Sequence, residues 1–281
     1  VNTASGSNPL MVYVLSGIDW ANGSTVASVV DGAPYGYDWA IHKGRLYIFG
    51  GGDRAVTTLY YTTTGNTWTA AAATGITAGT VFEGSRLLDN GNTLYAFAQT
   101  GATTFNIDSS TDNAVTFASV ATNIKGQLRS VGRYYDLAGV ERVYFMTEDT
   151  LYILSGSTPL AVWSLPSRGR ASVVWGESLY IFMDAMQVVR YTQEAVNRRT
   201  VEFISPGGGQ GMVSGKAFGE DTNGTVKVHA TARGVYAYWS GDGQTSGTLI
   251  SKLCLMWDGL GWHHKASVGT GSDIGGYAAR A

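Results

Sequence analysis

Short apolar segments with a tyrosine in the second or third position recur along the chain. Six copies occur, at residues 11–15, 46–49, 94–97, 143–146, 179–182 and 235–238. Their tyrosines lie 34 to 56 residues apart. The surrounding sequence is rich in Val, Thr, Tyr and Trp and is punctuated by 38 glycines. This pattern predicts short β-strands joined by tight turns.

A repeat of roughly 40 to 50 residues that contains several short strands predicts a β-propeller blade. Helical repeats of similar length are excluded because no long stretch has the 3.6-residue period of an amphipathic helix. The segment closest to a helix, 192–197, is long enough only for a turn. We therefore predict an all-β, six-bladed β-propeller. Five or seven blades remain alternatives, since the last repeat is long.

The whole chain, 1–281, is predicted to form a single propeller domain. Its approximate blades are 1–35 plus 272–281, 36–78, 79–125, 126–168, 169–209 and 210–271. The first blade lacks an inner strand, and residues 275–279 have the sequence of one. We expect the N- and C-terminal strands to share one blade, which closes the ring and removes exposed sheet edges.

Two blades show the strand order within the repeat. In the blade 36–78 we predict strands at 38–42, 45–50, 57–62 and 68–71, and in the blade 169–209 at 171–175, 178–182, 188–192 and 200–204. The glycine-rich segment 207–211 lacks the Lys-Ser/Thr and the helix of a phosphate-binding loop, so it is predicted to connect two blades.

Composition excludes several classes of protein. The net charge is −2 and only 14% of residues are charged, without the Lys/Arg stripe that nucleic acid requires. An apolar content of 44% excludes intrinsic disorder. No run approaches the length of a membrane span, so no membrane insertion is expected. The single cysteine, Cys254, excludes an internal disulfide and is predicted to be a buried thiol.

Three hairpins resemble the Asp-box of sialidase-type propellers, whose pattern is Ser-x-Asp-x-Gly-x-Thr-Trp. The first keeps Gly65, Thr67 and Trp68; the second keeps Ser110, Asp112 and Thr116, with Phe117 in the tryptophan position; the third, weaker one has Asp258 and Trp262. The same hairpins are similar to the kelch pattern, and degenerate Asp-boxes of this kind also resemble those of bacteriophage virion propellers. These motif residues are expected to hold hairpins together, and they carry no catalysis.

The resemblance to sialidases would imply an arginine triad, a tyrosine–glutamate pair and an acidic aspartate. The Arg-Ile-Pro signature of that family is absent, so the catalytic signature is missing. A glycosidase would need two carboxylates about 5 to 10 Å apart. The candidate acids near predicted strand ends are Asp38, Asp53, Glu83, Asp136, Glu177 and Asp184. They are expected mainly to cap turns or to face solvent, so we predict no catalytic residues and no enzyme activity.

Metal and cofactor binding are not expected either. His263 and His264 are adjacent, so on a strand their side chains point to opposite faces and cannot chelate one ion together. His42 and His229 are isolated in the sequence. We therefore predict no metal site and no cofactor.

Aromatic residues point instead to binding. The chain has eight tryptophans and sixteen tyrosines, and several stand beside Gly, Asn or Asp in loop-like contexts. Such aromatics commonly form sugar- or protein-binding faces. The candidate ligand- or partner-binding residues are Trp20, Tyr35, Tyr37, Trp39, Trp239 and Asp242. The alternative is that each tryptophan fills space between blades, above all Trp68, Trp163 and Trp262 on outer strands.

The main functional hypothesis is a non-enzymatic structural or attachment propeller of an extracellular particle, a bacteriophage virion protein of the tail, neck or capsid. Six lysines in 281 residues fit the composition of virion and secreted adhesive proteins. Its partners would be other virion proteins or a host-surface glycan or receptor, with a homo-oligomer in the assembly left open. The alternatives are a secreted carbohydrate-binding lectin and a glycosidase on a sialidase-like scaffold.

Overall fold

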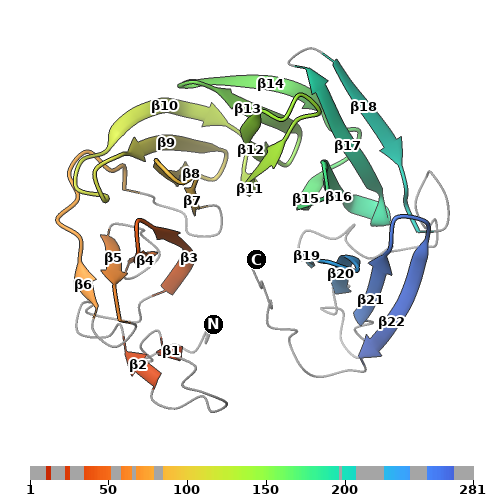
Figure 1. The fold of residues 1–281 in the computed structure, drawn as a ribbon, viewed down its shortest axis with the longest axis horizontal. Helices are drawn as coiled ribbons and strands as arrows, with labels where there is room; N and C mark the ends of the chain where they lie inside the picture. The colour runs from red at the N-terminus through yellow and green to blue at the C-terminus, as the bar shows by residue number, and fades with distance from the viewer. Residues whose placement is uncertain are drawn as a thin grey trace. The chain divides into compact units, whose positions relative to one another are not determined.

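The structure, a computed structural model, describes residues 11–13, 23–25, 35–51, 58–64, 68–78, 85–195, 198–206, 225–240 and 252–268. These residues form an all-β β-propeller with five four-stranded antiparallel sheets, the blades, and one two-stranded sheet. Figure 1 labels the strands. Contacts divide the chain into two compact units, Val1–Leu128 with Gly156–Pro159 and Arg129–Ser155 with Leu160–Ala281, which are described separately.

The first unit contains the two-stranded sheet and two blades. Strands β1 (Met11–Tyr13) and β2 (Gly23–Thr25) pair with each other. The blades, given in strand order, are β3 (Tyr35–His42), β4 (Arg45–Gly51), β5 (Thr58–Thr62) and β6 (Thr69–Ala70), then β7 (Arg86–Asp89), β8 (Leu94–Gly101), β9 (Thr104–Ser110) and β10 (Ala118–Lys125).

The second unit contains the three remaining blades, except for Leu128 and Gly156–Pro159, which belong to the first unit. These blades are β11 (Leu128–Tyr135), β12 (Glu141–Thr147), β13 (Thr150–Ser155) and β14 (Thr158–Ser164); β15 (Gly169–Trp175), β16 (Ser178–Met183), β17 (Val188–Ala195) and β18 (Arg198–Phe203); and β19 (Thr225–Thr231), β20 (Gly234–Ser240), β21 (Lys252–Trp257) and β22 (Trp262–Val268). A 3₁₀ turn, η3 (Asp184–Met186), follows β16.

The tyrosine repeat marks one position in every blade. Tyr47, Tyr95, Tyr144, Tyr180 and Tyr236 all lie in the second strand of their sheets. This strand has neighbours on both sides and both of its faces are largely covered, so nearly every position can be apolar. In β16, for example, five of the six residues are buried. The predicted strands of the blades 36–78 and 169–209 are confirmed to within a few residues.

The hydrophobic core lies between neighbouring blades of each unit. In the first unit Tyr47 and Phe49 of one blade pack with Leu87 and Ala96 of the next. In the second unit, one cluster joins β12 and β13 to β16 and β17, and another joins β16 to β20 and β21. Because alternate residues of each strand face opposite sides, the β15–β18 sheet contributes side chains to both clusters of the second unit.

The described residues bear on the predicted number of blades. Five blades are present among them, and β1 with β2 lies in the predicted first blade, 1–35. The expected closing strand, 275–279, and the glycine-rich connector 207–211 lie outside the described residues. Within the described part of the chain, no helix is long and apolar enough to cross a membrane.

The second Asp-box hairpin joins β9 to β10 and is held by its own side chains. The Ser110 hydroxyl donates to Asp112 Oδ1 at 2.7 Å and accepts from the backbone N–H of Ala114 at 3.1 Å. Asp112 Oδ1 also accepts from the N–H groups of Val115 at 3.1 Å and Thr116 at 2.9 Å. Ala114, in place of the usual glycine, has a φ of +60°. Ser110 and Asp112 therefore stabilise this hairpin through local hydrogen bonds.

Other Asp-box residues also stabilise turns or packing. Trp68 and Phe117 are both buried, and Asp258 Oδ1 accepts from the N–H groups of Leu260 and Gly261 at 2.8 and 2.9 Å. The indole N–H of Trp262 donates to the Ile204 carbonyl of the neighbouring blade. Gly65 and Thr67 lie outside the described residues.

The Asp112 hydrogen bonds predict an acid-dependent contribution to stability. Those from the Thr116 backbone and the Ser110 hydroxyl lower the pKa of Asp112 from 3.8 to about 2. A lowered native pKa means that the carboxylate stabilises the fold above its unfolded pKa, and that this stabilisation disappears as the pH falls towards 2. We expect Asp112→Asn to lower the denaturant midpoint at pH 7. The gap to the unmodified protein should narrow between pH 4 and 2, and a gap of constant size would contradict this.

Candidate functional site

The candidate binding residues predicted from sequence do not form one described site. Trp20 and Asp242 lie outside the described residues. Tyr35 and Tyr37 lie in strand β3, but their side chains are outside the description. Trp39, also in β3, is half-buried and packs against the cluster of Ile48, Tyr60 and Trp68. Trp39 is therefore a packing residue of its blade in this structure.

The expectation that Trp239 stands in a loop is wrong. Trp239 lies in strand β20 with 1% of its surface exposed. Its ring packs against Phe182, with centroids 5.8 Å apart, and against Trp262 at 5.9 Å. Strand β20 continues through Ser240, so Trp239 shares the buried face of Val235 and Ala237. It fills space between blades, as the alternative interpretation of the tryptophans held.

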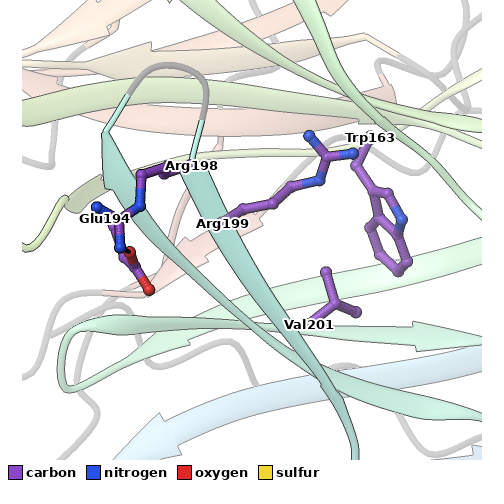
Figure 2. A pocket seen from close by; sticks show the side chains of 5 residues that line it. All are labelled: Trp163, Glu194, Arg198, Arg199 and Val201. Carbon is purple, nitrogen blue, oxygen red and sulfur yellow. Dashed lines mark ion pairs between the residues drawn. The ribbon is translucent and has the colours of Figure 1, made fainter.

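A groove in the second unit combines an aromatic ring with charged side chains. It has a volume of about 600 Å³ and is lined by Trp163, Glu194, Arg198, Arg199 and Val201. Trp163 comes from the outer strand β14 of one blade, and the other four residues come from the β17–β18 hairpin of the next blade. The groove therefore lies at the outer strands of two neighbouring blades of the same unit (Figure 2).

Strand alternation separates the charged residues of the hairpin. Arg199 and Val201 are two positions apart on β18, so they share one face, whereas Arg198 belongs to the other. In Figure 2, Arg199 extends towards the Trp163 side chain, with Val201 below it, while Arg198 and Glu194 lie on the far side of the β18 ribbon. The groove thus has an aromatic–arginine wall and an ion pair at the hairpin end.

Trp163 is held in place by packing. Its ring stacks on Tyr191 of β17, with centroids 6.1 Å apart and planes at 29°. Tyr191 is buried in the core cluster that includes Leu151 and Ile153, and Trp163 packs against this cluster. Burial raises the pKa of Tyr191 to about 12, and the nearby positive charge of Arg199 opposes that rise. The half-buried indole is therefore a rigid surface beside a guanidinium group.

Glu194 is already engaged within the hairpin. Its Oε2 lies 2.7 Å from Arg198 Nη2, and its Oε1 accepts from the Thr200 hydroxyl at 3.1 Å. Among the residues that the structure describes, no carboxylate lies within ion-pair distance of Arg199, which is exposed. With two arginines and one glutamate, the groove carries one uncompensated positive charge.

In a second depression of this unit, the carboxylate of Glu148 is already paired with two arginines. It has a volume of about 480 Å³ and is lined by Glu148, Asp149, Leu165, Ser167 and Arg168. Glu148 Oε2 accepts from Arg168 Nη2 at 2.7 Å and from Arg129 Nη2 at 3.1 Å. Burial favours the neutral acid, but these hydrogen bonds outweigh it and keep the pKa of Glu148 below its ordinary value. Glu148 is thus part of an ion network.

The candidate glycosidase acids take part in structural contacts. Asp38 Oδ2 accepts from the Leu87 backbone N–H at 2.9 Å, and Asp184 pairs with Arg170. Asp136 Oδ1 accepts from two N–H groups of its own turn, and its Oδ2 accepts from Arg142 at 3.0 Å. Glu177 lies exposed in the β15–β16 turn, and Asp53 and Glu83 lie outside the described residues. Asp38, Asp136 and Asp184 therefore connect or cap strands, the role expected for them.

Three of the four histidines take part in packing or in polar contacts. His42 is fully buried and its Nδ1 lies 2.6 Å from Asp89 Oδ1. His229 stacks on Tyr236 with centroids 5.0 Å apart, and His263 pairs with Asp258 at 2.7 Å. These contacts give each of the three histidines a packing or hydrogen-bonding partner that the sequence did not reveal.

Sequence reasoning missed Glu194, Arg198, Arg199 and Val201, and it assigned Trp163 to packing alone. The available signal was the Arg198–Arg199 doublet four residues after Glu194, in a segment predicted as a turn. Residues 192–195 are instead the end of strand β17, which continues the hairpin and places Arg199 opposite Gln193.

Comparison with known proteins reveals similarity to propeller structures at low identity. No protein-family model matches the chain, and no curated protein matches its sequence. Among solved structures, YCF48 from Cyanidioschyzon merolae aligns with a TM-score of 0.48 and 12% identity, over 79% of this chain and 69% of that one. The SapL1 lectin in complex with alpha methyl fucoside aligns with a TM-score of 0.47 and 14% identity, over 85% and 82%. An alpha-L-arabinofuranosidase from Clostridium thermocellum has a TM-score of 0.40 and 12% identity, over 84% and 93%.

Proposed function

We propose that this chain is a non-enzymatic attachment propeller that binds saccharides in the groove between β14 and β18. The observation that carries this proposal is the combination of a rigid, half-buried indole, Trp163, with the hydrogen-bonding side chains of Glu194, Arg198 and Arg199 around one groove.

Each part of the groove suits a sugar. The C–H face of a pyranose ring packs against an indole, and the sugar hydroxyls need fixed donors and acceptors at its edge. Trp163 is fixed by Tyr191 and Glu194 by Arg198, so little side-chain freedom would be lost on binding. A volume of about 600 Å³ accommodates a short saccharide.

The context of this binding is proposed from composition and motifs. Six lysines, abundant Gly and Thr, and degenerate Asp-boxes favour a protein of an extracellular particle, a bacteriophage virion in particular, over a free lectin.

Electron microscopy of the native source tests this virion context, because density at regular positions on a tail, neck or shell is expected. A free monomer in the native source would contradict the virion role and favour the secreted lectin. A reproducible glycan cleavage by the pure protein would contradict the non-enzymatic part and favour the glycosidase.

The same proposal includes six blades closed by both termini. Strands β1 and β2 would belong to the first blade, and 275–279 would supply its inner strand. Support comes from the tyrosine of Met11–Tyr13, which matches the second-strand tyrosine of the five described blades.

Trp163 is predicted to be the main contact of the groove. We expect a glycan array to yield at least one bound saccharide, and Trp163→Ala to weaken its binding by about tenfold to a hundredfold, because the loss of one large apolar contact costs about 1.5–3 kcal/mol. Trp163→Phe should retain part of the affinity, since a smaller ring remains.

The matched control is Trp175→Ala. Trp175 is a half-buried tryptophan of the same unit, on β15, and it lies outside the groove. Its variant should lose stability without losing affinity, and thermal unfolding of both variants separates these effects. Equal loss of affinity in the two variants, or an array with no bound saccharide, would contradict the proposed function.

A further inference from the structure

The groove between β14 and β18 has a charge that its own residues do not balance. Arg198 is neutralised by Glu194, whose two carboxylate oxygens are both engaged. Arg199 carries the remaining charge, and the described residues provide no acid within ion-pair distance of it. Another arginine of the β17–β18 hairpin, Arg190, is paired with Glu202 on the opposite strand. A ligand that enters the groove therefore meets one free guanidinium group.

The position of Arg199 directs this charge into the groove. Its side chain leaves β18 on the face that it shares with Val201 and extends towards Trp163 (Figure 2). Its effect on Tyr191 places the charge near the Trp163–Tyr191 stack. A guanidinium group presents N–H donors in a planar fork that matches a carboxylate with two parallel hydrogen bonds. A neutral sugar hydroxyl uses only part of that fork.

Resting on the proposed saccharide binding, we propose that the groove selects an acidic saccharide, with the ring of an acidic sugar on Trp163 and its carboxylate paired with Arg199. Charge complementarity and the aromatic surface together favour this ligand over the alternatives. A neutral sugar would leave the Arg199 charge without a partner, and an acidic peptide would make no use of the flat indole surface. Sulfated sugars share the negative charge, although a tetrahedral sulfate fits the planar fork less closely than a carboxylate.

The test compares saccharides that carry a free carboxylate with forms in which that charge is absent. Binding of oligogalacturonate is measured against its fully methyl-esterified form, and binding of sialyllactose against its methyl ester, by calorimetry at two salt concentrations. In at least one pair the acidic form should bind about tenfold or more tightly, because hydrogen bonds to charged groups are about twice as strong as neutral ones. Sulfated lactose is the third arm, and it should bind more weakly than sialyllactose.

Variants assign the preference to one side chain. Arg199→Gln should weaken binding of the acidic form by about tenfold and of its neutral counterpart by a much smaller factor, so that the preference disappears, whereas Arg199→Lys should retain part of the preference. Arg233→Gln is the control, because it removes the same charge from the exposed β19–β20 turn, outside the groove. It should leave both affinities unchanged.

The outcomes separate this inference from the proposed function. Equal binding of acidic and neutral forms, or stronger binding of the sulfated form, overturns the carboxylate preference and leaves saccharide binding intact. Equal effects of Arg199→Gln and Arg233→Gln overturn the assignment to Arg199, because they indicate a general effect of charge. Competition by a short poly-glutamate peptide as strong as that by sialyllactose overturns the choice of a sugar. Absence of binding for every saccharide overturns both proposals.

Discussion

Gln99→Met is expected to destabilise the chain by about 2–4 kcal/mol, since a buried polar group left without a partner costs about 1–3 kcal/mol. Gln99 is fully buried in β8, at a register shift where β8 and β9 lose their regular pairing. Its Nε2 donates to the carbonyls of Gly101 at 2.8 Å and Thr104 at 3.0 Å, and its Oε1 accepts from the Leu128 N–H at 3.1 Å. Methionine has a similar volume and offers none of these hydrogen bonds.

The substitution therefore isolates hydrogen bonding from packing. The Thr104 carbonyl keeps the Thr100 hydroxyl, so the Gly101 carbonyl and the Leu128 N–H carry most of the cost. Gln187→Met is the matched control. Gln187 is half-buried and accepts one hydrogen bond from the Ser167 hydroxyl, so its loss should cost less than about 1 kcal/mol. Urea unfolding of the two variants measures the difference, and equal midpoints would contradict the role of Gln99 at the register shift.

The blades were predictable because their signal is local. An apolar strand with tyrosine, bounded by glycine, occupies the second position of each four-stranded sheet, where neighbours on both sides leave little room for polar residues. The Asp-box hairpin was predictable for the same reason, because Ser110 and Asp112 bond to backbone groups within six residues of themselves. Local hydrogen bonds and strand periodicity need no knowledge of the neighbouring blade.

The groove was not predictable because it combines two blades. Trp163 and Arg199 are 36 residues apart, and only the packing of β14 beside the β17–β18 hairpin makes them line one cavity. Trp163 was expected to fill space between blades. It does pack against Tyr191, and it also lines the groove. Conversely, Trp239 precedes Ser, Gly and Asp, which suggested a loop, although β20 runs through Ser240 and buries the ring. Polar neighbours in sequence do not reveal which face of a strand a side chain takes.

Trp163 can serve both packing and binding because one ring has two faces. Stacking on Tyr191 and the contacts of the core cluster determine its orientation, and the remaining surface lines the groove. A binding aromatic fixed in this way loses little conformational entropy when a ligand arrives. The same packing restricts variation, because a substitution at Trp163 alters the core and the groove together.

Gly234→Ala is expected to have the largest effect on stability, about 2–6 kcal/mol, because backbone strain and overpacking each cost about 1–3 kcal/mol. Gly234 begins β20 with a φ of +149°, a conformation that L residues rarely adopt. A Cβ atom there would lie 2.1 Å from the carbonyl oxygen of Trp257, on the neighbouring strand β21. Relief requires movement of backbone, and Trp257 belongs to the core cluster of this blade and its neighbour.

Gly44→Ala separates the cost of backbone strain from the cost of overpacking. Gly44, in the β3–β4 turn, also has a positive φ, +77°, but a Cβ atom there would meet nothing within 4 Å. Its variant should therefore show the strain of the positive φ alone, about 1–2 kcal/mol. Denaturant unfolding of both variants measures the contribution of the close approach to β21 as the difference between them. Equal losses would mean that the Gly234 turn adjusts freely, and that contact with the Trp257 carbonyl does not require glycine at this position.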